Sequence, residues 1–269
     1  HDTFEIMLWR SLVGLVLVAG FCVATGRLRD VRRDRLGSHL LRNVVHFAGQ
    51  NLWFWALASI PLAQVFAIEF TSPLWVILLA ALFLGERLTR VRLFGAALGF
   101  LGILVVAQPD FAALEPGVIA AALSALCFAA TNVLTKVLTR GEGIVSILFW
   151  LTLMQLAFSL VAVLWDGRAT APTAATLPWL ALIGVAGLGA HLCLTTALSL
   201  APAGFVVTLD FARLPVIALV GWVVYAEAVS PAVFAGAGLI LAGILLNLRA
   251  GTSAAGTQPE RDNSVTPRH

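Results

Sequence analysis

The chain has 269 residues, of which 60% are hydrophobic and 12% are charged, and its mean hydropathy is +0.95. Soluble globular domains carry about twice that share of charged residues, so the composition excludes a soluble enzyme or binding module and indicates a polytopic membrane protein. The net charge of +3 does not indicate a nucleic-acid interface, because the basic residues lie in separate short segments between apolar runs.

Apolar runs of about 20 residues, the length that a helix needs to cross the hydrocarbon of a bilayer, recur along the whole chain. These lengths favour helices over the strands of a β-barrel, which cross in about 10 residues of alternating character. The polar stretch 250–269 is predicted to be a disordered tail. The runs predict nine transmembrane helices, at 4–24, 39–58, 61–84, 91–107, 116–138, 144–165, 177–199, 203–225 and 231–248.

Arginine is unevenly divided between the polar connections that join these runs. It recurs in the first, third and fifth connections, whereas Arg168 is the single basic residue of the alternate ones. Lysine and arginine are enriched in the cytoplasmic connections of membrane proteins. The sequence therefore predicts that the odd-numbered connections and the C-terminal tail are cytoplasmic.

The second half of the chain repeats the first at a constant offset of 141 residues, without a gap. The repeat at 115–249 contains five spans, and an odd number gives two copies opposite orientations in the membrane, as in the inverted repeats of secondary transporters. The copy at 1–109 contains four spans, so we expect a further helix before residue 1 and ten helices in all. The offset aligns Pro61 with Pro202, Glu69 with Asp210, Glu86 with Glu227, and Gly102 with Gly243.

Two segments carry a family resemblance: ALASIPLAQVFAIEFTSPLWVILLAALFLGERL in the first half and ALSLAPAGFVVTLDFARLPVIALVGWVVYAEAV in the second. They resemble the drug/metabolite transporter superfamily, in its ten-helix EamA type. The resemblance implies a carrier of the bacterial inner membrane with cytoplasmic termini. It also implies a central cavity between the two halves, with the last helix of each half outside the cavity. Members of the superfamily move amino acids, nucleosides, vitamins, S-adenosylmethionine or metal-chelating metabolites.

Glu69 and Asp210 are the carboxylates that the spacing places near the middle of the membrane, about 12 Å and 10 Å from its boundaries. A charge at that depth costs about 2.5 to 3.5 kcal/mol on insertion scales and usually faces a polar cavity or an ion partner. Arg213 lies on the helical face of Asp210, and Arg10 is close in depth to Glu69. We expect all four side chains to bind substrate or to couple its movement to protons, with Glu69 as the coupling residue. Structural ion pairs are the alternative.

A polar stripe precedes Glu69 on the preceding helix, formed by His46, Gln50 and Asn51 and followed by Trp53. The repeat counterpart of Gln50 is His191. Polar residues at helical spacing within a span face protein or water rather than lipid. The stripe either contributes to the transport site, with His46 relaying protons because imidazole titrates near neutral pH, or supplies hydrogen bonds between helices.

Prolines and glutamates recur at matching positions of the two repeats. Pro73 and Pro215 follow the two carboxylates and are predicted to bend their helices at the binding site, unless the bends serve packing alone. Glu86 and Glu227 are predicted to cap the helix that follows each of them. The glycines of the last helix in each repeat predict close helix packing, within the chain or in a homodimer.

We therefore predict an all-α polytopic membrane protein that acts as a secondary active transporter of a small polar or zwitterionic metabolite. Its expected partners are the solute, protons or a counter-solute, the lipid bilayer and a second copy of the chain. No catalytic constellation, metal site, cofactor or ATP-binding motif is expected, and no nucleic acid. A non-transporting scaffold or an intramembrane enzyme is the alternative. The family does not define the solute or the direction of transport.

Overall fold

The computed structural model describes residues 2–60, 62–86, 88–107, 115–167, 170–213, 216, 219, 223 and 231–255. Within these residues all regular structure is helical. The elements are α1 (Thr3–Ala24), η1 (Arg27–Asp30), α2 (Leu36–Ser59), α3 (Leu62–Glu69), α4 (Ser72–Leu84), α5 (Arg90–Ala107), α6 (Pro116–Thr139), α7 (Ile144–Asp166), α8 (Leu177–Leu200), α9 (Ala203–Leu209), η2 (Asp210–Ala212) and α11 (Pro231–Ala255).

The helices follow the predicted spans closely, with two informative differences. The span predicted at 61–84 is broken into α3 and α4, and α11 runs through Ala255, past the predicted end of the last span at 248. The rest of the predicted tail, 256–269, lies outside the described residues. Five stretches of the described chain are long and apolar enough to cross a membrane: α1, α3 with α4, α6, α7 and α8. The prediction of an all-α polytopic membrane protein is therefore confirmed.

Local sequence signals fix several helix ends. Asp2 and Glu5 form a reciprocal capping box at the start of α1, in which each carboxylate accepts from the other residue's backbone N–H. A proline stands in the first turn of α4, α6 and α8, where the missing N–H breaks no helical bond. Gly85 ends α4 in the left-handed conformation, at φ 68°, which favours glycine.

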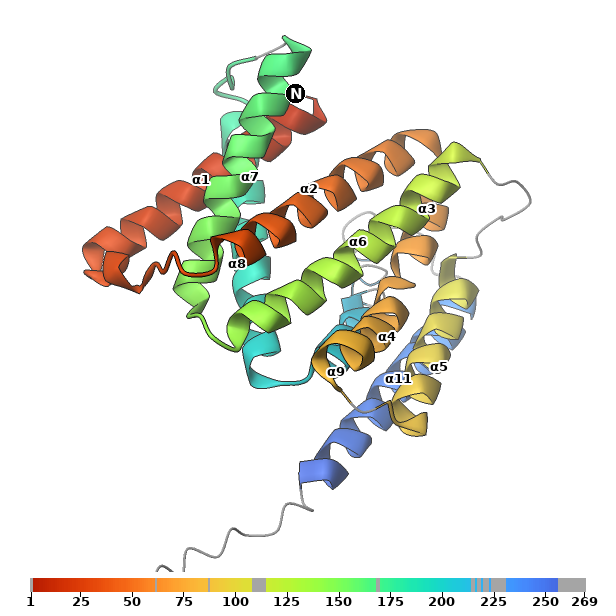
Figure 1. Cartoon of the computed structure of the whole chain (residues 1–269). Coiled ribbons are helices and arrows are strands. Elements are labelled where there is room, and N and C mark those ends of the chain that lie inside the picture. The colour runs from red at the N-terminus through yellow and green to blue at the C-terminus, as the bar shows by residue number, and fades with distance from the viewer. Residues whose placement is uncertain are drawn as a thin grey trace, which may run out of the picture.

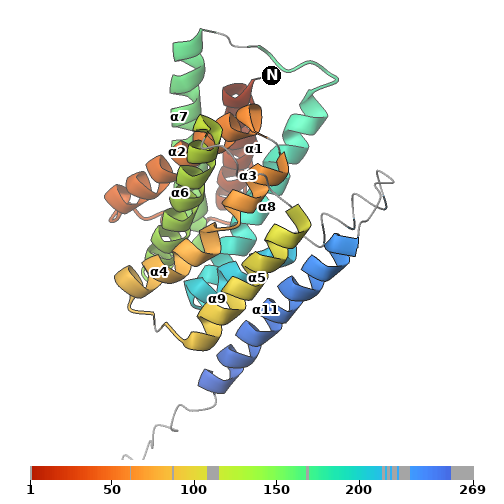
Figure 2. The ribbon, with the colours of Figure 1, turned by 90° about the vertical axis from the view of Figure 1, so that its right-hand side faces the viewer.

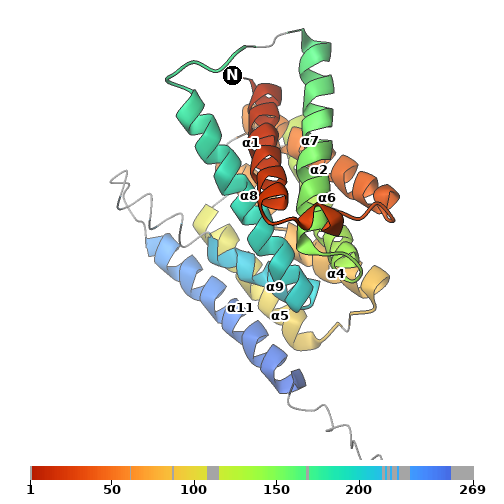
Figure 3. The same cartoon turned by 90° about the vertical axis from the view of Figure 1, so that its left-hand side faces the viewer.

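The helices form one bundle in which segments far apart in sequence lie side by side (Figure 1). α1 packs against α7 and α8, and α2 packs along α6. α5 and α11 run side by side along one edge of the bundle (Figures 2 and 3). The last helix of the first half thus pairs with the last helix of the second.

Glycines allow α5 and α11 to approach closely. A Cβ atom on Gly102 would lie 2.6 Å from the carbonyl oxygen of Gly236, and one on Gly243 would overlap the backbone of Gly95. Real Cβ atoms do not come that close, so these positions need glycine. The glycine faces predicted for close packing therefore contact each other within a single chain.

Replacing Gly102 with valine is expected to force α5 and α11 apart and to lower the free energy of unfolding by about 1 to 3 kcal/mol, the usual cost of overpacking. Gly238→Val is the matched control, because a Cβ there has no atom within 4 Å. Thermal melting of the detergent-purified variants measures the difference. Equal melting temperatures for the two variants would contradict the close glycine contact.

The connections 25–35, 85–89, 140–143 and 201–202 gather at one end of the bundle, which we call the arginine-rich end. The backbone N–H of Arg32 donates to Ser146 Oγ at 3.2 Å, and Arg140 donates to the carbonyl of Leu84 at 3.1 Å. Lys136 Nζ donates to the last carbonyls of α8, at 2.6 Å to Leu198 and 2.8 Å to Ala201. The connections in which the sequence concentrates arginine are thus joined to one another.

Glu86 also lies at the arginine-rich end, where it caps a different helix from the one predicted. Its Oε1 accepts from the backbone N–H of Ala203 at 2.7 Å and its Oε2 from that of Gly204 at 3.3 Å. It therefore caps α9, in the second half of the chain, rather than the following helix α5. The turn at Gly85 redirects the chain before α5 begins, and the small residues 203 and 204 let the carboxylate approach. Glu227 lies outside the described residues.

An apolar cluster fills the bundle behind this end. It combines residues of α4, α6, α8 and α9 that are almost completely buried. All of these side chains are aliphatic, so van der Waals packing between the helices holds this part of the bundle together. Its members are Val76, Ala80, Leu84, Ala129, Val133, Leu198, Ala203, Val206 and Val207.

Candidate functional site

Two helix ends lie in the middle of the bundle and place the predicted carboxylates. α3 ends at Glu69, and α4 begins at Ser72, with Pro73 in its first turn. Pro73 has no N–H to offer the carbonyl of Glu69, so the helical hydrogen bonds stop there. In the second half α9 ends at Leu209, and Asp210 opens the short helix η2. Pro215 lies outside the described residues.

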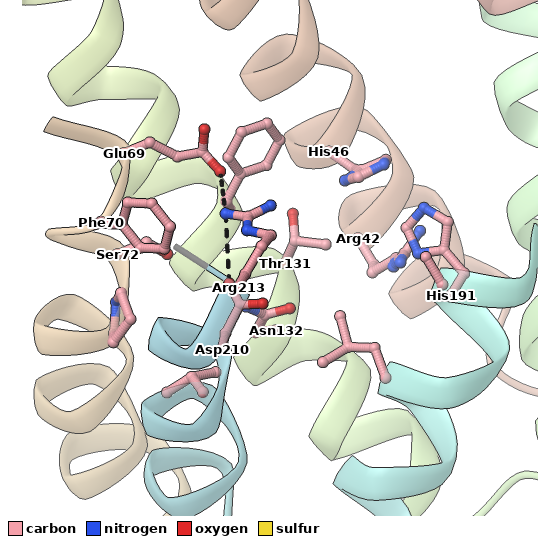
Figure 4. Close-up of a pocket in the computed structure, with 15 residues that line it drawn as sticks. Arg42, His46, Glu69, Phe70, Ser72, Thr131, Asn132, His191, Asp210 and Arg213 are labelled. Atoms are coloured by element: carbon pink, nitrogen blue, oxygen red, sulfur yellow. Dashed lines mark hydrogen bonds and ion pairs between the residues drawn. The ribbon is translucent and has the colours of Figure 1, made fainter. Parts of the chain in front are cut away.

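These ends border a cavity of about 310 Å³ between α2, α4, α6, α8 and α9 (Figure 4). Its wall combines charged, aromatic and neutral polar side chains, as expected for a site that binds a polar organic molecule. The lining residues are Arg42, His46, Glu69, Phe70, Ser72, Pro73, Phe128, Thr131, Asn132, Ala190, His191, Leu194, Val207, Asp210 and Arg213.

Arg213 holds the two carboxylates together on one side of the cavity. Its guanidinium lies 2.9 Å from Glu69 Oε1 and 3.5 Å from Asp210 Oδ2, and it stacks over the ring of Phe70 at 4.9 Å (Figure 4). The Glu69 side chain is only 13% exposed, whereas that of Asp210 is 53% exposed. Trp53 donates its indole N–H to the second oxygen of Glu69 at 2.7 Å. Both oxygens of Glu69 therefore have a donor, and Asp210 remains open to the cavity.

Histidine and arginine lie on the opposite side of the cavity. The rings of His46 and His191 meet edge to face with their centroids 5.1 Å apart, and His46 also lies 5.9 Å from Phe128. Arg42 is 2% exposed and lies beside both histidines (Figure 4). Its Nε donates to Thr135 Oγ1 at 3.2 Å and its Nη1 to Asn43 Oδ1 at 3.0 Å.

The remaining predicted residues lie outside the cavity lining. Arg10 does not reach Glu69. It packs against Gly187. Its Nη1 donates to the side-chain oxygen of Gln50 at 3.1 Å, with the Gln50 amide oriented so that its oxygen faces Arg10 and its nitrogen faces Gln155. Asn51 donates to the carbonyl of Phe47 on its own helix, at 2.7 Å. The structure thus brings together Glu69, Asp210, Arg213, Trp53, His46 and His191, and holds Arg10, Gln50 and Asn51 apart.

Arg42 is a charged cavity residue that the sequence analysis did not include among the candidate site residues. It lies near the start of the predicted span 39–58, close to the arginine-rich first connection. The signal was present, because Arg42 precedes His46 by four residues and Gln50 by eight, on the same helical face. Extending the polar stripe by one turn toward the arginine-rich end would have included it.

The arrangement fits binding and charge compensation rather than covalent chemistry. On one side of the cavity Arg213 pairs with Glu69 and Asp210. On the other side lie Arg42 and the two histidines, and phenylalanine rings and an asparagine amide line the space between. Such a cavity can hold a planar or dipolar solute by stacking and by hydrogen bonds to its edges.

The chain is similar to known transporters over nearly its whole length. A model of the EamA-like transporter family matches residues 1–108 and 115–249. A riboflavin transporter of Brucella anthropi is 35% identical over 254 residues, which make up 92% of this chain and 89% of that protein. A riboflavin transporter of Vibrio cholerae is 29% identical over 244 residues, 88% of this chain and 79% of that protein.

The chain is also similar to a more distant transporter and to a solved structure. An S-adenosylmethionine uptake transporter of Rickettsia bellii is 24% identical over 239 residues, 89% of this chain and 81% of that protein. A solved crystal structure with 20% identity matches with a TM-score of 0.77, over 93% of this chain and 88% of the other, which shows a shared fold. The chain therefore belongs to the EamA-like transporter family and is a multi-pass membrane transporter of a small metabolite.

Proposed function

We propose that this protein is a secondary active transporter of riboflavin in the bacterial inner membrane, with its arginine-rich end and C-terminus in the cytoplasm. The observation that carries the proposal is the cavity beside Glu69 and Asp210, whose lining combines aromatic rings with paired charges. Phe70, Phe128 and the two histidine rings offer stacking surfaces to a flat heterocycle. Thr131 and Asn132 offer hydrogen bonds to its edges. The relatives named as riboflavin transporters support this choice of solute.

The transport cycle is proposed to be alternating access between two inverted repeats. Three features support it: the gapless 141-residue offset, the pairing of α5 with α11, and the end of an α-helix at equivalent positions, where α3 ends at Glu69 and α9 passes into the 3₁₀ helix η2 at Asp210. In this structure the apolar cluster behind the arginine-rich end separates the cavity from that end. The described state would then be closed toward the cytoplasm.

Proton binding at Glu69 is proposed to couple the cycle to the pH gradient. Glu69 is nearly buried and Arg213 can pair with Asp210 instead, so a proton can replace Arg213 on Glu69 without leaving an unpaired charge. Exchange against a second solute would use the same cavity. We further propose that the solute crosses unchanged, since the cavity pairs no nucleophile with a positioned base.

Uptake of labelled riboflavin into proteoliposomes with an imposed pH gradient tests the function. We expect saturable accumulation that collapses when a protonophore removes the gradient, and competition by unlabelled riboflavin but not by S-adenosylmethionine. Accumulation of labelled S-adenosylmethionine but not of labelled riboflavin would replace the solute and keep the transporter mechanism. Absence of flux for any screened metabolite would favour a non-transporting scaffold.

A further inference from the structure

The Arg42 side of the cavity contains a buried cation with no anionic partner. Arg42 is 2% exposed, and its hydrogen bonds go to two neutral oxygens, on Thr135 and Asn43. Within the described chain no carboxylate lies at ion-pair distance from it. The cavity carboxylates Glu69 and Asp210 are both engaged by Arg213 on the opposite side.

His46 provides a second, independent observation at the same place. It is 7% exposed, and neither of its ring nitrogens has a hydrogen-bond partner. Buried polar atoms are nearly always paired, and those that are not usually await a water, an ion or a ligand. The His46 ring lines the cavity together with Arg42 and His191 (Figure 4). A buried charge without an anionic partner and an imidazole without a hydrogen-bond partner therefore lie side by side, and an anionic acceptor would satisfy both.

We propose that Arg42, His46 and His191 form a subsite for an anionic group of the solute, a carboxylate or a phosphate. The group would pair with the guanidinium of Arg42, which Thr135 and Asn43 hold in place, and would accept a hydrogen bond from His46. The rest of the solute would extend past Phe128 toward Arg213 and Asp210. The subsite rests on the transport function proposed above and adds to it a preference for acidic solutes, so that riboflavin 5′-phosphate is a better ligand than riboflavin.

Riboflavin and riboflavin 5′-phosphate differ by a single anionic group and form a matched pair of probes. Binding of each to the full chain in nanodiscs is measured by tryptophan fluorescence and calorimetry. We expect the phosphate ester to bind roughly tenfold more tightly to the wild-type protein, as charge-assisted hydrogen bonds to arginine predict. Arg42→Gln should reduce the ratio of the two affinities to about one, whereas Arg42→Lys, which keeps the charge, should retain part of the preference.

The outcomes separate the subsite from the proposed function. If riboflavin binds and the phosphate ester binds no better, the subsite is refuted and riboflavin transport stands. If neither flavin binds, riboflavin is the wrong solute, and inorganic phosphate at constant ionic strength becomes the probe: it should raise the melting temperature of wild type but not of Arg42→Gln. An equal shift in both proteins refutes the subsite. Should Arg42→Gln fail to reach the membrane, the wild-type comparison and His46→Asn, with an expected smaller loss of preference, decide the question.

Discussion

Arg213→Leu is expected to abolish solute uptake while leaving membrane insertion intact. Arg213 is the cation that both cavity carboxylates contact, at 2.9 Å and 3.5 Å. Removing one partner of a fully buried ion pair costs about 3 to 5 kcal/mol, and the cost here is smaller because the Arg213 side chain is 42% exposed to solvent. The Glu69 carboxylate would keep only the indole N–H of Trp53. The cavity would then carry two carboxylates with no cation between them.

Uptake into proteoliposomes, with protein amount measured by gel filtration, provides the test. Arg29→Leu makes the same chemical change at an exposed position of η1, outside the cavity, and should transport like the wild type. Double substitution to Arg213→Leu with Glu69→Gln removes both charges and should restore stability but not transport. Normal uptake by Arg213→Leu would show that the pair is a structural feature alone.

Glu69→Gln is expected to lose accumulation driven by a pH gradient, while exchange of solute across the membrane persists in part. Glutamine keeps the shape of glutamate but cannot gain and lose a proton. Its amide also offers only one acceptor where Glu69 offers two, so either Arg213 or Trp53 would face an N–H group. Asp210→Asn should be milder, since Asp210 is half exposed and makes the longer contact with Arg213.

The decisive measurement compares accumulation with and without an imposed pH gradient for both variants. We expect Glu69→Gln to reach only equilibration in either condition. Asp210→Asn serves as the control for loss of a negative charge in the same cavity. Unchanged proton dependence in Glu69→Gln would transfer the coupling role to Asp210 or His46, or would remove protons from the mechanism.

Sequence reasoning reached most of the fold because hydropathy is a strong signal. Each predicted span coincides with a described helix, with two exceptions. The span 61–84 is divided into α3 and α4, and of the span 203–225 only α9, η2 and a few further residues are described. The break near Pro73 was predictable from the chemistry of proline. The helix that Glu86 caps was harder to predict, because it begins 117 residues away in the sequence. That contact depends on how the two halves of the chain pack together.

The site was predicted in part, and the limits have a physical cause. Glu69, Asp210 and Arg213 were identifiable because a charged side chain within a hydrocarbon span is costly and is usually functional or ion-paired. Their contact was only half predictable: helical spacing places Arg213 beside Asp210, but the stronger contact, with Glu69, crosses between the halves. The sequence places Arg10 and Glu69 at a similar depth in the membrane, but depth does not predict which helices are neighbours. Arg10 belongs to α1, which packs against α7 and α8 and so lies away from Glu69.

The contact between Glu86 and the start of α9 also bears on how long the protein stays in one state. Opening the arginine-rich end would strip the Glu86 carboxylate of two backbone donors, those of Ala203 and Gly204. Each hydrogen bond to a charged group contributes about 1.5 to 3 kcal/mol, and every 1.4 kcal/mol changes a rate tenfold. In the alternating-access cycle proposed above, the dwell time of the state closed at the arginine-rich end is therefore expected to depend steeply on this one acidic side chain.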